Sequence, residues 1–207
     1  MFEIIIAILN FLTMPVRKLW TFYRRPRLQV YFDPNESYHT RNVVNLGVRG
    51  FFCHVMVKNI GKEIALTCRG RLIKVEVPES GLLVGHADFQ PSVTLKWGHE
   101  PDFDPRDIEP DIPRLLDVCC VFEPSPNILR FASDKSPCGI RTDFPRGNYV
   151  VTIRCDGKNL KPIDAQFVIR HQGAWNETKV EPFGKKRLRN AQSLAGRGAS
   201  RPKQLKN

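Results

Sequence analysis

Apolar residues alternate with polar ones along the middle of the chain, and this period of two is the strongest constraint on its fold. The alternation is clearest in five stretches, at residues 52–58, 66–72, 116–122, 149–155 and 163–169. Successive side chains of a β-strand point to opposite faces of a sheet, whereas a helix buries residues at a spacing of 3.6. No long stretch with helical spacing lies between these five. The sequence therefore predicts an all-β fold, an antiparallel β-sandwich that buries one face of each sheet.

Two local sequences give this sandwich a family resemblance. Residues 55–68 (VMVKNIGKEIALTC) fit two strands joined at Asn59 and Gly61, which supply the positive φ angles of a tight hairpin. Residues 145–169 fit a turn and two strands, with Tyr149 placed as in a tyrosine corner, whose hydroxyl bonds back to the preceding backbone. Together they resemble the immunoglobulin-like and CARDB-like sandwich modules of many bacterial proteins, over residues 30–170. The resemblance implies an immunoglobulin-like architecture and a tendency to bind proteins, without assigning a functional residue.

The first 23 residues are mostly apolar and run into a cluster of cations. As a helix, residues 2–23 extend about 33 Å and cross a hydrocarbon core of about 30 Å, but the uncharged residues 4–16 cover only about 20 Å. Glu3, Asn10, Arg17 and Arg24 recur at every seventh position, which favours a helix in the plane of the interface or one with a polar seam. The pattern therefore predicts a spanning or an in-plane anchor, and it fits a signal peptide or an ordinary buried helix less well.

Two sets of residues follow as candidates for contact with a membrane. The apolar and aromatic set forms the anchor: Phe2, Ile4, Ile5, Ile6, Ile8, Leu9, Phe11, Leu12, Leu19, Trp20, Phe22 and Tyr23. The cationic set is expected to contact anionic lipid or another polyanion: Arg17, Lys18, Arg24, Arg25, Arg27, Lys185, Lys186, Arg187 and Arg189.

The net charge of +11 is carried by the two ends of the chain. Residues 1–29 hold five cations and one acid, and residues 184–207 hold eight cations and no acid. Residues 30–183 are nearly neutral, with 19 basic and 20 acidic residues. Nucleic-acid-binding domains usually carry cations among aromatic residues on a folded surface, whereas this tail has no aromatic residue. The pattern predicts an anchor with a basic flank (1–27), a β-sandwich domain (28–183) and a disordered basic tail (184–207).

The six cysteines indicate a reducing compartment. Most of them lie in apolar runs, where a free thiol behaves as a small hydrophobic residue, and no pair has the C-x-x-C spacing of a zinc or redox site. The Cys…Trp…Cys arrangement of true immunoglobulin domains is also missing. Reduced cysteines and the cations downstream of the apolar segment independently predict that the domain faces the cytoplasm.

Nothing in the sequence indicates catalysis, and we expect no cofactor and no metal. The five histidines are scattered, and no phosphate-binding loop, dinucleotide motif or nucleophile elbow occurs. Residues 99–111 hold six carboxylates, but three prolines and the lack of glycine fit an extended acidic loop better than a Ca²⁺ site. Residues 76–91 carry Leu82, Leu83, Val84 and Phe89, which form either an interaction patch or a lid over the core.

The sequence as a whole predicts a non-enzymatic interaction module that is anchored in the membrane and binds a protein partner at its cytoplasmic face. No small-molecule substrate is evident. The competing hypothesis is a nucleic-acid-associated protein that binds through the basic tail.

Overall fold

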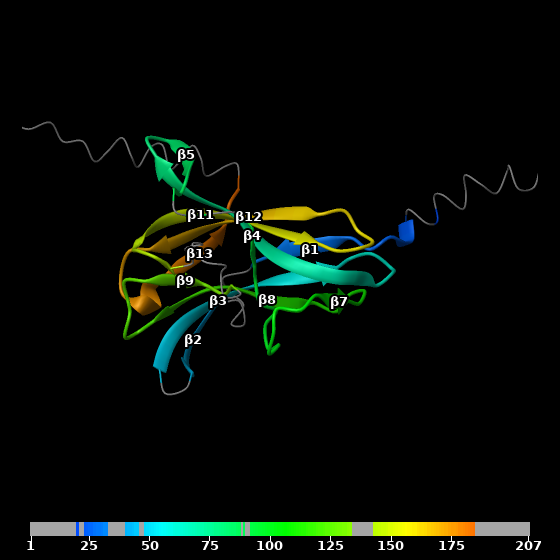
Figure 1. The fold of residues 1–207 in the computed structure, drawn as a ribbon, viewed down its shortest axis with the longest axis horizontal. Coiled ribbons are helices and arrows are strands. Elements are labelled where there is room, and N and C mark those ends of the chain that lie inside the picture. The colour runs from blue at the N-terminus through cyan, green and yellow to red at the C-terminus, as the bar shows by residue number, and fades with distance from the viewer. Residues whose placement is uncertain are drawn as a thin grey trace, which may run out of the picture.

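The computed structural model describes residues 20, 23–32, 40–45, 48–87, 89, 92–133 and 143–184, with residues 40–45 described by their backbone alone. Within these residues the chain forms two antiparallel sheets, one of six strands and one of seven (Figure 1). The predicted all-β, antiparallel fold is thereby confirmed for the described part of the chain. A short 3₁₀ turn, Trp175–Glu177, lies among the strands of the described part.

The six-stranded sheet has the order β1-β3-β8-β9-β10, and β2 pairs with the other half of the long strand β3. Its strands are β1 (Leu28–Tyr31), β2 (Thr40–Asn45), β3 (Val48–Asn59), β8 (Arg114–Phe122), β9 (Leu129–Phe131) and β10 (Asp143–Phe144).

The seven-stranded sheet has the order β13-β12-β11-β4-β5, and the short strands β6 and β7 both pair with β4. Its strands are β4 (Ala65–Glu79), β5 (Leu82–Gly85), β6 (Val93–Thr94), β7 (Arg106–Ile108), β11 (Gly147–Asp156), β12 (Ile163–His171) and β13 (Lys179–Pro182).

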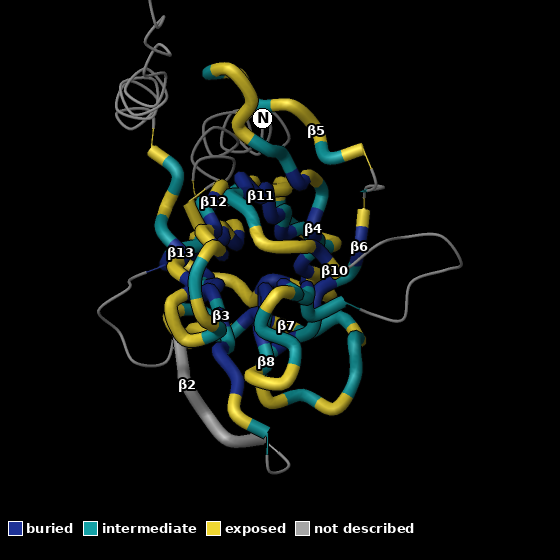
Figure 2. The backbone as a smooth tube through the Cα atoms, turned by 90° about the vertical axis from the view of Figure 1, so that its left-hand side faces the viewer, coloured by how far each residue is buried: buried dark blue, intermediate teal, exposed yellow. Residues whose placement is uncertain are grey.

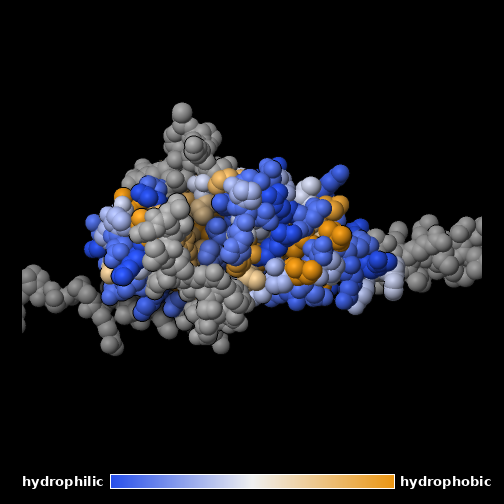
Figure 3. Space-filling model, turned by 90° about the horizontal axis from the view of Figure 1, so that it is seen from below, coloured by the Kyte–Doolittle hydropathy of each residue, from blue (hydrophilic) through white to orange (hydrophobic). Residues whose placement is uncertain are grey.

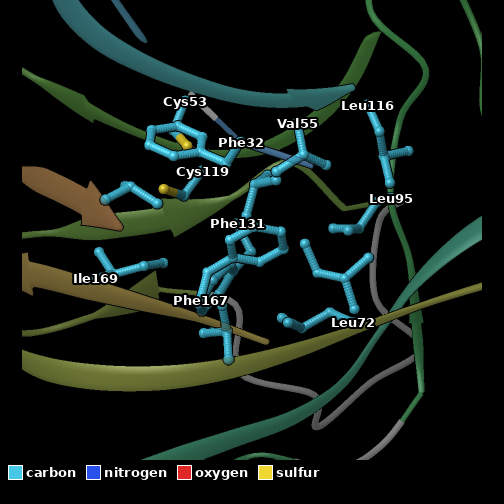
Figure 4. Packing of buried hydrophobic residues seen from close by; sticks show 14 of the residues in the cluster. Phe32, Cys53, Val55, Leu72, Leu95, Leu116, Cys119, Phe131, Phe167 and Ile169 are labelled. Atoms are coloured by element: carbon cyan, nitrogen blue, oxygen red, sulfur yellow. The ribbon is translucent and has the colours of Figure 1, made fainter. Parts of the chain in front are cut away.

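One hydrophobic core lies between the two sheets (Figure 2). Cys53 and Val55 of β3 lie across this core from Phe167 and Ile169 of β12, as Figure 4 shows. Phe32, just after β1, contacts Phe167 edge to face, with 6.3 Å between the ring centroids. The buried positions of β3 and β12 therefore follow the predicted period of two, because each strand presents one face to the core.

The turn before β11 carries the predicted hydrogen bond of Tyr149. Its hydroxyl donates to the carbonyl oxygen of Pro145 at 2.7 Å, four residues upstream, while its ring is buried. Gly147 is required beside this ring, because an added Cβ would lie 2.8 Å from the tyrosine oxygen. The bond fixes the direction in which the chain enters β11, the central strand of its sheet.

The five described cysteines are free, and four of them are buried. Burial raises the pKa of both the Cys68 and the Cys120 thiols to about 12. Cys53 and Cys119 are directly opposed in the β3–β8 ladder, and the pKa of Cys119 is raised by its hydrogen bond with Cys53 and by burial. The thiols of Cys68, Cys119 and Cys120 therefore stay protonated, and the cysteines of the core pack as hydrophobic side chains, as the sequence predicted. Cys138 lies outside the described residues.

His171 makes the stability of the fold depend on pH. Its side chain is fully buried; Nδ1 lies 3.0 Å from the hydroxyl of Thr178, whereas Nε2 has no partner among the described residues. Burial, with a smaller contribution from Arg146, lowers its pKa from 6.5. Since the unfolded chain then binds the proton more tightly, stability is complete above pH 6.5 and falls as the pH drops toward the folded-state pKa.

We therefore expect a shallower pH dependence of stability in the variant His171→Gln, which carries no titrating group at this position. Urea unfolding of both chains at a series of pH values between about 7 and about 5 measures the two slopes, which are expected to differ by no more than about 1.4 kcal/mol per pH unit, the contribution of one proton. Identical slopes for the wild-type chain and the variant would contradict this assignment.

Candidate functional site

Four segments meet at the end of the molecule where the chain enters β1, which we call the entry end. They are residues 24–27, the β3–β4 turn at 60–64, the β7–β8 loop at 109–112 and the β11–β12 loop at 157–162. In Figure 1 the blue start of the described chain, the cyan β3–β4 turn and the yellow β11–β12 loop lie together on the right. The entry end therefore combines segments that are far apart in the sequence.

The side chain of Asn59, at the end of β3, joins two of these segments to the last residue of β7. It is completely buried, and its Oδ1 accepts hydrogen bonds from the backbone N–H groups of Arg27 at 3.2 Å and Gly61 at 2.9 Å. Its Nδ2 donates to the carbonyl oxygens of Glu63 at 2.7 Å and Ile108 at 3.0 Å. All four hydrogen-bonding positions of the amide are thus filled, and together the bonds fix three stretches of backbone.

The prediction that Asn59 and Gly61 supply positive φ angles is wrong. The positive φ angles among the described residues belong to Thr67, Ser80, Gly81, His99 and Asp111. Asn59 acts instead through its side chain, and Gly61 is needed for space. A Cβ on Gly61 would collide with the carbonyl oxygen of Arg25 and lie 2.7 Å from Cα of Pro26.

The basic flank of the predicted anchor is bonded into the folded domain. The carbonyl oxygen of Arg27 accepts from the N–H of Ile60 at 2.8 Å, and that of Arg24 accepts from Lys62 at 3.1 Å and Glu63 at 3.0 Å. With the Arg27 N–H bound to Asn59, the flank runs along the β3–β4 turn as an additional layer of backbone. Its geometry relative to the domain is consequently fixed from Arg24 onward.

The β11–β12 loop is held against the same turn. Asn159 donates from Nδ2 to the carbonyl oxygen of Ile64 at 2.8 Å and accepts at Oδ1 from the N–H of Leu66 at 2.8 Å. The N–H of Lys158 donates to the carbonyl oxygen of Leu66 at 3.0 Å, and Leu160 packs against the core. These contacts place the loop beside residues 25–28.

A groove of about 560 Å³ lies between residues 25–28 and 158–163. Four of its lining residues are cations, Arg25, Arg27, Lys158 and Lys161, and none is acidic. These four cations and Lys62 of the β3–β4 turn make no ion pair within the described residues. Two neighbouring cations do: Arg24 pairs with Glu63, and Lys58 pairs with Asp111, both on the exposed surface. Five cations without an ion pair among the described residues therefore gather at the entry end, together with one unpaired acid, Glu109.

Exposed apolar side chains accompany these cations. Ile60 and Ile64 of the β3–β4 turn are 42% and 45% exposed, and Ile112 of the neighbouring loop is 54% exposed. Figure 3 shows hydrophobic residues gathered on the surface toward this end. Apolar side chains rimmed by cations are typical of surfaces that contact another protein or a membrane.

Five of the predicted contact residues fall within the described part of the chain. Trp20 and Tyr23 are exposed by 62% and 59%, and Arg24, Arg25 and Arg27 begin the entry end. The other predicted residues lie outside the described part: the anchor residues at 2–12, Leu19 and Phe22, the cations Arg17 and Lys18, and Lys185, Lys186, Arg187 and Arg189 of the tail. In the part that is described, no helix combines the length and the hydrophobicity needed to cross a membrane.

Four of the six acidic residues in 99–111, namely Glu100, Asp102, Asp107 and Asp111, have contacts within the domain. Arg106 lies 2.7 Å from Asp102 and 3.3 Å from Glu100, Arg114 lies 3.2 Å from Glu100, and Asp107 accepts from the N–H of Thr67. A backbone hydrogen bond from Asp104, followed by Arg106, lowers the pKa of Asp102. The described residues contain no group of three or more side chains suited to hold a metal ion. The segment also differs from the predicted extended loop, because β7 within it pairs with β4.

Residues 76–91 divide between the two predicted roles. Phe89 packs against the core, with its ring 6.4 Å from that of Phe144, so it acts as a lid. Leu82 and Val84 of β5 remain 71% and 42% exposed on a hairpin that projects from the body, away from the entry end (Figure 1). Ser80 and Gly81 form its two-residue turn with φ angles of 49° and 84°, a signal already present in the Ser-Gly dipeptide.

Comparisons of the chain with protein-family models, with curated proteins and with solved structures give no match.

The variant Asn59→Ala tests whether this amide holds the entry end together. It leaves two N–H groups and two carbonyl oxygens without their partner, so we expect the free energy of unfolding to fall by about 2–4 kcal/mol. Asn127→Ala, in the exposed turn before β9, is the matched control and should change it by less than about 0.5 kcal/mol. Urea unfolding of the full chain measures both, and equal effects of the two substitutions would contradict the role of Asn59.

Proposed function

We propose that the protein is a non-enzymatic interaction module, held at the cytoplasmic face of a membrane with its entry end toward the bilayer. The observation that carries this proposal is the hydrogen bonding of the basic flank into the domain. Because Arg24 and Arg27 are bonded to the β3–β4 turn, the cations of the flank and those of the domain lie at one end. The predicted apolar segment leads directly into that end.

The distance between the apolar segment and the domain supports a fixed orientation. Tyr23, the last residue of the predicted anchor, immediately precedes Arg24, which already accepts two hydrogen bonds from the turn. If the anchor extends to Tyr23 as the sequence predicts, no further residue separates it from backbone that is bonded to the domain. An anchor in the bilayer, whether spanning or in-plane, would therefore bring the entry end to the headgroups.

The chemistry of the entry end suits an anionic surface. Each Lys or Arg near such a surface contributes about 1 kcal/mol, and this end carries five cations without an ion pair among the described residues. The exposed side chains of Ile60, Ile64 and Ile112 can enter the interfacial layer beside them. Electrostatic and hydrophobic contacts then act on the same face of the domain.

The surface away from the bilayer is proposed to receive a protein partner. The β4–β5 hairpin presents Leu82 and Val84 on this side, and exposed apolar residues on a projecting hairpin are suited to bind another chain. An immunoglobulin-like sandwich, proposed from the resemblance and supported by the Tyr149–Pro145 hydrogen bond, is an architecture that often serves this purpose. Attachment to the membrane would raise the effective concentration of the module for a membrane partner.

Washing of cell membranes tests the proposal. Full-length protein and a variant ending at Gly184 are expressed, and the membrane fraction is washed with high salt and then with alkaline carbonate. We expect both proteins to remain in the membrane after both washes, because the proposed attachment lies in the N-terminal segment rather than the tail. Release of the full chain by salt alone, together with loss of binding in the truncated variant, would contradict it and favour the nucleic-acid hypothesis.

A further inference from the structure

We propose that the groove between residues 25–28 and 158–163 is a binding site for a phospholipid headgroup with a phosphate monoester, which carries more than one negative charge. This inference rests on the proposed function, because it assigns a lipid class to the end that is proposed to face the bilayer. It extends that function from attraction to a charged surface to selection among anionic lipids.

The lining of the groove matches such a headgroup in charge. Each of the two segments contributes two cations, Arg25 and Arg27 from one and Lys158 and Lys161 from the other, and no acidic residue lines the groove. A guanidinium group donates in parallel to two phosphate oxygens, and an ammonium group adds a compact charge. Because these four side chains have no ion pair among the described residues, a phosphate need not displace an internal partner.

The size and the remaining lining of the groove suit a lipid rather than a small inorganic anion. Its volume of about 560 Å³ lies within the 300–1,000 Å³ typical of small-molecule sites, and far exceeds what a phosphate ion alone would fill. Leu28, Leu160 and Ile163 also line it. These apolar side chains offer a surface to the glycerol and the first methylenes of the acyl chains.

The backbone at Arg27 and Lys158, one cation in each wall of the groove, is already fixed without a ligand. Arg27 is held at its N–H by Asn59 and at its carbonyl oxygen by Ile60, and Lys158 is bonded to Leu66. Asn159, between the two lysines, uses both atoms of its amide to bind Ile64 of the β3–β4 turn and Leu66 of β4. A prearranged backbone lowers the entropic cost of binding, which favours a specific site over diffuse attraction.

The position of the groove selects a membrane lipid as its occupant. Arg25 is two residues after Tyr23, the end of the predicted anchor, so the groove would lie at the level of the headgroups. The exposed residues Ile60 and Ile64 belong to the turn that binds both walls, at Arg27 and at Asn159. Insertion of this turn would bring the opening of the groove to the lipid phosphates.

The test compares ligands on the full chain in zwitterionic detergent micelles, by isothermal titration calorimetry. The probes are short-chain phosphatidic acid, short-chain phosphatidylserine and inorganic phosphate. We expect phosphatidic acid to bind at least tenfold more tightly than either of the other two. Equal affinity for phosphatidic acid and phosphatidylserine would overturn the proposal, and so would equal affinity for inorganic phosphate.

Two variants locate the binding. Lys158→Gln/Lys161→Gln should weaken phosphatidic acid binding by about tenfold or more, and Arg25→Gln should weaken it by about fivefold. The control Lys74→Gln/Lys179→Gln removes the same charge from exposed positions on β4 and β13 and should leave the affinity unchanged. Wild-type affinity in the groove variants, or an equal loss in the control, would overturn the assignment.

The membrane washes separate this inference from the proposed function. The wild-type chain and the variant Lys158→Gln/Lys161→Gln can both stay in the membrane after the washes and yet bind the three ligands equally well. In that case only the headgroup site is overturned. If the wild-type chain itself is released by salt, the proposed function fails, whatever the affinities in micelles.

Discussion

The buried amide of Asn59 is the interaction on which the functional end of this molecule depends. It binds the chain before β1, the turn after β3 and the last residue of β7, so three segments share one side chain. The two sheets and their core give the domain its body, but they do not determine where the basic flank lies. Asn59 and the adjoining turn hold the flank by hydrogen bonds. The folded structure therefore fixes the direction in which the chain enters β1.

This constraint gives the molecule two different ends. The entry end carries exposed isoleucines and cations without an ion pair among the described residues, whereas the β4–β5 hairpin projects away from it with Leu82 and Val84 exposed. No acidic residue lines the groove, and among residues 99–111 Glu100 and Asp102 are paired with Arg106 and Arg114, and Asp111 with Lys58. A nearly neutral domain is thus locally basic where it is proposed to meet the bilayer.

The sequence predicted what depends on local pattern. The period of two in 52–58 and 163–169 indicated the strands, and Tyr149 was placed well enough to predict its bond to the preceding backbone. It did not predict that Asn59 acts through its side chain, because its partners at 27 and 108 are distant along the chain. Lys158 and Lys161 were missed for the same reason: only the folded chain places the β11–β12 loop beside Arg25 and Arg27.

The orientation of the domain on the bilayer tests the central claim most directly. Environment-sensitive fluorophores are attached to Ile60→Cys and, separately, to Leu82→Cys in a Cys138→Ser full chain reconstituted in anionic vesicles. Of the native thiols that the structure describes, four are buried and Cys120 is partly buried, which protects them from labelling. Quenching by nitroxide-labelled headgroups is predicted to be strong for the label at 60 and weak for the label at 82. Equal quenching at both positions, or stronger quenching at 82, would contradict an entry end that faces the membrane.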